Sequence, residues 1–382
     1  METDGTPALK RAQPLRPLHR RAGGFAETSG RTRHGRSVGG DEFAFVCSDA
    51  EATASALGER MVVCLKEPFK VDGSTIRLGA SVGIAVAMAG DLSAPRLADE
   101  LFKSADIALY GAKADGGGNV RVFEQSMLER IHARQSMKQE LGGALERGEL
   151  SLAYQPLLDL DSGRVRGFEA LLRWSHTTRG NVSPAEFIPL AEETGLIVEM
   201  GDWVLETACR QALLWPEEIS VAVNVSAVQF RSDSLPEAVA CVLARSGLVP
   251  GRLELEITES VLLQDSEHNM RILHALKDLG VGIALDDFGT GFSSLSYLRL
   301  FPFDKLKLDR SFVEDIGQST SSEAIIRAAG EMGRALSMVT TAEGVETAEQ
   351  LEWLRANGWS QAQGYHIGRP SGAPSVWGMF RD

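Results

Sequence analysis

Polar and charged side chains occur in this sequence where buried strands would be expected to hold apolar ones. They stand near or just after the C-terminal ends of short apolar runs. The set comprises Glu169, Asn224, Glu256, Glu259, Asp286, Asp287, Lys307, Asp309, Glu343, Glu346 and Gln363. Charged residues are almost never fully buried unless they are paired. Their repeated placement therefore indicates one shared site.

The chemistry of such a site follows from its residue types. Several carboxylates in one place would repel each other and raise each other's pKa unless cations lay among them. Oxygen ligands without cysteine or paired histidine favour Mg²⁺ or Mn²⁺ over zinc. The adjacent Asp286 and Asp287 suit two metal ions, with one carboxylate bridging both. Such a site polarises a phosphodiester and makes hydroxide from water at neutral pH.

Each of these residues also has a simpler structural interpretation. Asp-Asp-Phe-Gly at residues 286–289 is, taken alone, typical of a turn or a helix cap. Lys307 could pair with a single neighbouring acid. These interpretations would all have to hold across six strand ends to dismiss the site. Because buried charge is strongly disfavoured, a shared site is the better explanation.

The elements that must position these side chains alternate between strand and helix from about residue 149. Eight apolar runs predict strands at Leu150–Leu158, Val165–Trp174, Val221–Val225, Leu253–Ile257, Gly282–Leu285, Lys305–Leu308, Val339–Ala342 and Ala362–Ile367. Helical patterns lie between most of them, at Pro184–Thr194, Trp203–Leu214, Leu235–Ser246, Ser266–Leu279, Ser322–Leu336 and Ala348–Asn357. This α/β pattern over residues 149–382 predicts a (β/α)8 TIM-like barrel, whose strand ends converge on one face. An open doubly wound sheet is the alternative, but it usually carries fewer strands.

The residues before the barrel differ in composition. Residues 1–38 hold eight basic and three acidic side chains with few large apolar ones, which predicts a disordered basic tail. Residues 39–124 predict a small α+β unit, with elements at Phe43–Cys47, Glu51–Leu65, two strands within Phe69–Ala87, Leu97–Ala114 and Val120–Phe123. Residues 125–148 repeat apolar positions at helical spacing and predict a connecting helix that ends near Gly148.

Composition limits the classes of function. The net charge is −13, and the basic tail leaves about −18 for the remainder, which argues against binding of nucleic-acid polymers. No apolar run approaches the roughly 18 residues of a membrane span, and the first 21 residues lack the apolar core of a secretory signal. The cysteines have no CxxC spacing, which suits a reducing compartment. These features predict a cytoplasmic protein without a transmembrane segment.

Over residues 136–382 the motifs resemble those of the EAL domain, in the order of that family. They are Gln155-Pro156, Glu169-Ala170-Leu171, Pro184–Pro189, Asn224-Val225-Ser226, Glu256-Ile257-Thr258-Glu259, Asp286–Gly291, Lys307-Leu308-Asp309, Glu343–Glu346 and Gln363-Gly364-Tyr365. The resemblance implies hydrolysis of cyclic di-GMP to linear 5′-pGpG with two Mg²⁺ or Mn²⁺ ions, usually in a homodimer.

The resemblance also implies a metal ligand set. The first ion would be held by Glu169, Asn224, Glu256 and Asp286. The second would be held by Asp286, Asp287 and Glu343, although Glu343 could instead be the general base.

Further roles carry over from the same motifs. Lys307 would orient the attacking water or stabilise the developing charge. Glu259 would anchor the loop Asp287–Ser294, whose glycines permit movement. The substrate-contacting residues would be Gln155, Arg173, Asp309 and Gln363, with Arg173 suited to bidentate phosphate recognition.

The unit at residues 39–124 resembles the second half of a GGDEF diguanylate cyclase domain. Its landmarks are Gly39–Phe43, Ser81–Ala85 and Ala105–Lys113. No Asp-x-Asp-x-Phe-Lys segment precedes them, and the inhibitory Arg-x-x-Asp site is missing. The resemblance therefore predicts a truncated domain without cyclase activity.

Two alternatives to a hydrolase remain. A catalytically inactive EAL receptor would bind cyclic di-GMP without turnover, but such receptors lose metal ligands or loop glycines, and here every matched ligand is present. A bifunctional cyclase and hydrolase would need the missing half of the GGDEF domain. The sequence thus favours a one-way hydrolase.

Overall fold

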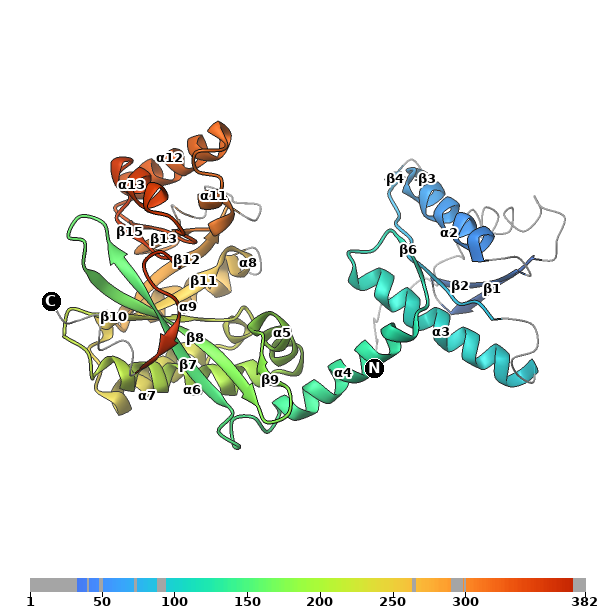
Figure 1. The fold of residues 1–382 in the computed structure, drawn as a ribbon, viewed down its shortest axis with the longest axis horizontal. Helices are drawn as coiled ribbons and strands as arrows, with labels where there is room; N and C mark the ends of the chain where they lie inside the picture. Colours follow the sequence, from blue (N-terminus) through green and yellow to red (C-terminus); the bar gives the residue numbers. More distant parts are fainter. Residues whose placement is uncertain are drawn as a thin grey trace, which may run out of the picture. The chain divides into compact units, whose positions relative to one another are not determined.

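The computed structural model describes residues 33–39, 41–47, 51–71, 74–87, 94–262, 266–289, 298 and 300–373. The chain divides into two compact units, Met1–Arg134 and Gln135–Asp382. Figure 1 shows the strands and helices of each unit. None of the described helices is both long and apolar enough to cross a membrane.

The first unit is the predicted α+β arrangement. Its described elements are β1 (Arg33–Gly39), β2 (Glu42–Cys47), α2 (Glu51–Lys66), β3 (Phe69–Val71), β4 (Ser74–Ile76), β5 (Val82–Ile84), α3 (Ala94–Ala114) and β6 (Val120–Val122). Strands β1 and β2 pair antiparallel, as do β3 and β4, whereas β5 and β6 run parallel. Helix α3 packs closely on β5, since a Cβ added at Gly83 would lie 2.1 Å from the carbonyl oxygen of Ala105.

Two details of the first unit differ from the prediction. Most of the predicted tail lies outside the described residues, but residues 33–38 form strand β1 instead of a tail. This strand has the sequence RHGRSVG, in which Val38 is the single large apolar residue, so it lacks the alternation that signals a strand. The segment Phe69–Ala87 holds three strands, β3 to β5, where two are predicted.

Helix α4 (Gln125–Leu141) begins in the first unit and ends in the second. It stops before the predicted end near Gly148. Gly142 and Gly143 follow directly, and glycine is unfavourable in a helix because it loses the most backbone freedom. Turns then lead to Gly148, which has a φ of 68°.

The second unit is the predicted closed barrel with helices outside it (Figure 1). Around the ring, its described strands are β7 (Leu150–Asp159), β15 (Gln361–Ala362), β14 (Val339–Ala342), β13 (Lys305–Leu308), β12 (Gly282–Phe288), β11 (Leu253–Thr258), β10 (Ser220–Asn224) and β8 (Val165–His176). Strand β8 pairs with β7 and closes the ring. Each predicted run supplies one strand, although β15 covers two residues where Ala362–Ile367 is predicted.

One strand of the barrel runs against the others. Strand β7 is antiparallel to both β8 and β15, while the remaining neighbours pair in parallel. A tight turn joins β7 to β8, and Asp159 Oδ1 accepts a hydrogen bond from Ser162 N at 2.8 Å within it. Two short strands, β9 (Gly180–Val182) and β16 (Ser371–Gly372), extend the sheet beyond β8 and β7.

Most helices of the barrel unit begin and end near their predicted bounds. The described ones are α5 (Pro184–Thr194), α6 (Leu196–Ala212), α7 (Leu235–Ser246), α8 (Glu259–Leu262), α9 (Ser266–Asp278), α11 (Arg310–Glu314), α12 (Thr320–Ala335) and α13 (Ala348–Ala356). Helix α13, for example, starts with a capping box in which Thr347 and Gln350 satisfy each other's backbone N–H groups. Helix α6, however, begins seven residues before the predicted Trp203, and the short helices α8 and α11 are not predicted.

Two hydrophobic clusters stabilise the barrel unit. The larger one lies between the strands and the helices α6, α7, α9 and α12. The smaller one contains Trp174 of β8, Phe187 and Leu190 of α5, and Leu141 at the end of α4. The last turn of α4 is therefore part of the core of the barrel unit.

Replacing Leu141 with alanine should destabilise the barrel by about 2–5 kcal/mol, because it leaves a cavity at a fully packed position. Leu141 is 3% exposed, whereas the control residue Leu214 is 57% exposed. Leu214→Ala should change the free energy of unfolding by less than about 0.5 kcal/mol. Urea unfolding followed by tryptophan fluorescence measures both, and equal midpoints for the two variants would contradict the packing of α4.

Candidate active site

The ammonium group of Lys307 lies among four carboxylates. Lys307 is on β13, which is buried along its whole length, and the residue is 1% exposed. Its Nζ is 2.6 Å from Glu343 Oε1, 2.8 Å from Glu256 Oε2, 3.1 Å from Asp286 Oδ1 and 3.8 Å from Glu169 Oε2. The five side chains come from the neighbouring strands β11, β12 and β13, from the residue after β14, and from β8, which β10 separates from β11.

Burial and crowding shift the pKa values in this cluster. Burial alone would lower the pKa of Lys307, but the surrounding carboxylates raise it well above its ordinary value. Burial, together with the charge of Glu169, raises the pKa of Glu256 well above its usual range despite the nearby ammonium. The pKa of Asp287 is also raised, first by burial and then by Asp286. The acids of the cluster thus outnumber its one ammonium group, and burial and crowding disfavour ionisation of Glu256 and Asp287.

The carboxylate of Glu169 accepts hydrogen bonds from two amide side chains and lies near the Lys307 ammonium. Asn224 Nδ2 donates to its Oε1 at 2.7 Å, and Gln363 Nε2 donates to its Oε2 at 2.6 Å. Burial would raise the pKa of Glu169, but Lys307, Gln363 and Asn224 outweigh burial and lower it. Gln363 Nε2 also donates to Gln155 Oε1 at 3.1 Å. The predicted residues Asn224, Gln155 and Gln363 therefore lie beside the predicted ligand Glu169.

A β-bulge places Asp286 and Asp287 on the same side. Successive side chains of a regular strand point to opposite faces, so two adjacent aspartates could not both reach one site. The register between β12 and β13 shifts by one residue between Leu285 and Phe288. Asp287 has a φ of 54°, a left-handed conformation that is uncommon outside glycine, and its N–H donates to Asp286 Oδ1 at 3.0 Å.

These carboxylates fit a divalent cation. Asp286, Asp287 and Glu343 each offer an oxygen atom, and the three atoms lie within 4.8 Å of one another. Glu256 Oε1 is buried and has no hydrogen-bond partner among the described residues. Buried polar atoms without partners are costly, and a bound cation would satisfy this one. The chain therefore has oxygen donors of the kind that Mg²⁺ or Mn²⁺ takes.

The turn that carries Glu343 depends on a glycine. Gly344 has a φ of 73°, and a Cβ at this position would lie 2.4 Å from the Cβ of Arg310. Both the conformation and the close approach exclude larger residues. Steric exclusion of a side chain at position 344 thus accounts for the glycine in the Glu-Gly-Val-Glu motif.

The remaining predicted residues lie outside this cluster of direct contacts. Glu259 is the first residue of α8 and is buried; the loop it is predicted to anchor lies outside the described residues from residue 290 to 297. Asp309 caps α11 by accepting from Ser311 N at 3.0 Å, and its charge helps to raise the pKa of Asp287. Arg173 is half-buried on β8, and burial lowers its pKa.

One contact of the site has no signal in the sequence. Gln155 Nε2 donates to the carbonyl oxygen of Gly368 at 3.2 Å. A backbone acceptor is independent of residue type, so no motif reveals it. The Gly-Arg-Pro sequence at residues 368–370 indicates at most a turn.

Comparison with known families identifies the second unit. Residues 138–370, more than half of the chain, match the family described as "EAL domain". The chain belongs to the EAL family. Residues 30–119 match the family described as "Diguanylate cyclase, GGDEF domain". A GGDEF domain therefore precedes the EAL domain, as the motifs predict.

Individual relatives extend this result. Protein y4lL of Sinorhizobium fredii is 47% identical over 90% of this chain and 41% of its own length. The "Bifunctional diguanylate cyclase/cyclic di-GMP phosphodiesterase MucR" of Pseudomonas aeruginosa is 41% identical over 89% of this chain and 50% of its own length. The chain thus spans about half the length, or less, of these relatives.

A solved structure resembles the EAL domain. It is titled "PaMucR Phosphodiesterase, c-di-GMP complex" and is 44% identical, with a TM-score of 0.61. The likeness covers 63% of this chain and 99% of the solved one.

The pKa of Glu343 predicts how the stability of the EAL domain depends on pH without divalent cations. Burial is the main cause that raises this pKa from 4.5 to about 8. Across this window the folded protein keeps a proton that the unfolded chain has released. The free energy of unfolding should therefore fall as the pH rises from 5 toward 8.

Glu343→Gln should remove that part of the pH dependence, because glutamine does not titrate. Urea unfolding in a chelating buffer across this range measures the effect. Glu352→Gln is the control, since Glu352 is an exposed residue of α13. The same pH dependence in wild type and Glu343→Gln would contradict the raised pKa.

Proposed function

We propose that this protein hydrolyses cyclic di-GMP to linear 5′-pGpG. The observation that carries the proposal is the Lys307 ammonium among carboxylates from adjacent strands, beside the triad Asp286, Asp287 and Glu343. Support comes from the relative MucR, described as a bifunctional diguanylate cyclase and cyclic di-GMP phosphodiesterase, and from the solved structure titled "PaMucR Phosphodiesterase, c-di-GMP complex".

Charge balance favours two divalent ions. Five carboxylates, from Glu169, Glu256, Asp286, Asp287 and Glu343, face one ammonium group, which leaves four negative charges if all are ionised. Two Mg²⁺ or Mn²⁺ ions would offset them. One ion would be held by Glu169, Asn224, Glu256 and Asp286. The other would be held by Asp286, Asp287 and Glu343. When bound, such ions polarise the phosphodiester and lower the pKa of water.

The side chains of the cluster have separate roles. Lys307 presents a positive charge, because the surrounding carboxylates raise the pKa of its amine in the protein without metal ions. It orients the attacking water or stabilises the negative charge that develops on the phosphate. Glu343, next to Lys307 Nζ, is either a ligand or the base that accepts the proton of the water. The role of base needs the ionised form of Glu343, which the Glu343→Gln variant cannot supply.

Substrate binding is assigned to the polar residues around the cluster. Arg173 offers a guanidinium fork that matches a phosphate in two hydrogen bonds. Gln363 Oε1 is buried without a partner in the part of the chain that the structure describes, and it remains available as an acceptor. Gln155 and Asp309 complete the set. Glu259 holds the loop after Asp287, and the active form is a homodimer.

Glu169→Ala or Asp286→Ala should abolish turnover at saturating Mg²⁺, since each removes a ligand that no neighbour can replace. Chromatographic detection of pGpG from cyclic di-GMP measures the rate. Ca²⁺ should support binding of the dinucleotide but no hydrolysis, because its looser coordination fits the reaction poorly. The control variant Glu352→Gln changes an exposed side chain of α13 and should keep the wild-type rate.

Two other results of these assays would contradict the proposal. Binding of cyclic di-GMP with Mg²⁺ but without pGpG would identify an inactive receptor. Near-normal rates in either alanine variant would mean that the ligands are wrongly assigned.

We also infer that this chain makes no cyclic di-GMP. Its sequence contains no counterpart of the Asp-x-Asp-x-Phe-Lys segment, which holds metal in the cyclases that the GGDEF motifs resemble. Incubation with GTP and Mg²⁺ should therefore yield no cyclic dinucleotide above a blank. Formation of cyclic di-GMP in the Glu169→Ala variant, which cannot consume it, would contradict this inference.

A further inference from the structure

The two edges of strand β8 have different partners near its end: β7 pairs with one edge as far as Leu150↔Trp174, including Ser151↔Arg173. Strand β10 pairs with β8 along Gly167–Ala170. Beyond that point the same edge of β8 pairs with β9, from Trp174↔Val182 to His176↔Gly180. Arg173 lies in this outer part, on the same face as Glu169 because side chains alternate along a strand. The position of Arg173 is therefore set by β7 on one edge and, on the other edge, by the β8–β9 hairpin that begins at the next residue.

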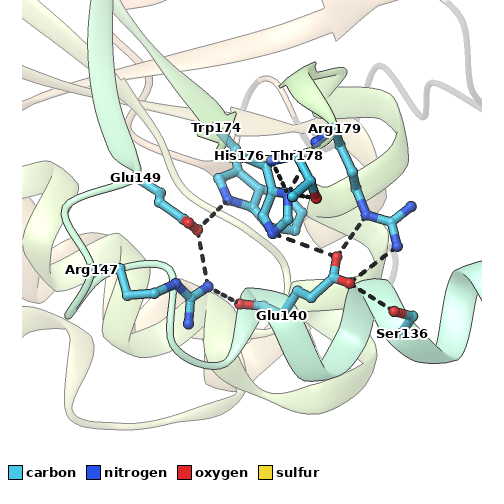
Figure 2. A network of polar contacts seen from close by, with 8 residues as sticks. All are labelled: Ser136, Glu140, Arg147, Glu149, Trp174, His176, Thr178 and Arg179. Atoms are coloured by element: carbon cyan, nitrogen blue, oxygen red, sulfur yellow. Dashed lines mark hydrogen bonds and ion pairs between the residues drawn. The ribbon is translucent and has the colours of Figure 1, made fainter.

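The last turn of α4 holds that hairpin (Figure 2). Glu140 Oε2 accepts from Arg179 Nε at 2.6 Å, and its Oε1 accepts from Arg179 Nη2 at 3.2 Å and from Ser136 Oγ at 2.7 Å. The hydrogen bonds from Arg179 and Ser136 lower the pKa of Glu140 to about 2, so the carboxylate stays ionised. Arg179 sits in the turn between β8 and β9.

His176 ties the same turn to Glu140. Its Nδ1 accepts from the backbone N–H groups of Thr178 at 3.3 Å and Arg179 at 3.2 Å, which leaves the proton on Nε2. His176 Nε2 lies 3.6 Å from Glu140 Oε2. Figure 2 shows Arg179 and His176 both directed toward the Glu140 carboxylate.

A second link joins α4 to β8 through Arg147. Its Nη2 donates to the carbonyl oxygen of Glu140 at 2.5 Å and to Glu149 Oε2 at 2.9 Å. Glu149 Oε2 also accepts from Trp174 Nε1 at 3.2 Å. Trp174 is the residue next to Arg173, and it points to the opposite face, into the cluster that includes Leu141.

The two site residues of β8 are not held equally. Glu169 is fixed by Asn224, Gln363 and Lys307 inside the barrel. The Arg173 guanidinium donates to the carbonyl oxygen of the adjacent Leu172 at 2.9 Å, and its backbone pairs with Ser151 of β7. Loss of the Glu140 contacts should therefore displace Arg173 more than Glu169.

We propose that Glu140 is a positioning residue for substrate binding, which acts through the β8–β9 hairpin on Arg173. This inference rests on the proposed function, because it takes Arg173 as a contact of the cyclic dinucleotide. It predicts a change in affinity with little change in the chemical step, since the carboxylate cluster stays in place.

Glu140→Gln should raise the Kd for cyclic di-GMP in Ca²⁺ buffer, and the KM in Mg²⁺ buffer, by about three- to tenfold. The kcat should stay within about twofold of the wild-type value, because the lost interaction stabilises bound substrate and transition state equally. Arg179→Gln should have the same effect. Hydrogen exchange of the amides of residues 173–182 should become faster in both variants.

The decisive variant is the double substitution Glu140→Gln with Arg173→Ala. If Glu140 acts through Arg173, the first change should weaken binding no further once Arg173 is absent. Lys138→Gln is the matched control, because Lys138 also lies on α4 but its Nζ pairs with Glu193 Oε2 of α5 at 2.6 Å. It should leave Kd and kcat within about twofold of wild type.

The outcomes separate this inference from the proposed function. Equal Kd values for wild type and Glu140→Gln, additive effects in the double variant, or a fall in kcat at unchanged KM would each overturn the role of Glu140. Binding with no hydrolysis by the wild type would contradict the proposed function alone, because the Kd measurements in Ca²⁺ buffer would still stand.

Discussion

The second unit depends on a buried ammonium group surrounded by acids. Bringing five acidic side chains together costs free energy through desolvation and mutual repulsion. Lys307 Nζ offsets part of that cost, since four of the five acids lie within 4 Å of it. The remaining negative charge calls for cations. The barrel can meet this requirement because β8 and the run from β10 to β14 are adjacent, and each delivers a polar side chain near one rim.

Much of this arrangement could be predicted from the sequence, because the signals are local. The buried strand Leu253–Thr258 contains Glu256, and the buried strand Lys305–Leu308 contains Lys307, so each polar residue stands out against an apolar run. The helices carry their own start and stop signals, such as Pro184 at the first turn of α5 and Gly195 at its end. Parallel strand ends then had to meet on one face.

Other features could not be predicted, because they depend on pairing between distant segments. The left-handed Asp287 turns two consecutive carboxylates to one side, but its sequence, Asp-Asp-Phe-Gly, looks like an ordinary turn. The hydrogen bonds from the Gln363 amide to Glu169 and Gln155 join segments far apart in the chain, so no local pattern indicates them. The pairing of β1 with β2 rests on backbone hydrogen bonds, and the polar sequence of β1 gives no sign of them.

The reversal of β7 also decides where the chain enters the barrel. Leu150, at the start of β7, pairs with Trp174, near the end of β8. In an all-parallel barrel the first strand would begin at the rim opposite the active site. Here it begins at the end where β8 finishes, and the backbone N–H of Ser175 donates to the carbonyl oxygen of Glu149. The direction of one strand thus brings Glu149 and the end of α4 to the same end of the barrel as the C-terminal end of β8.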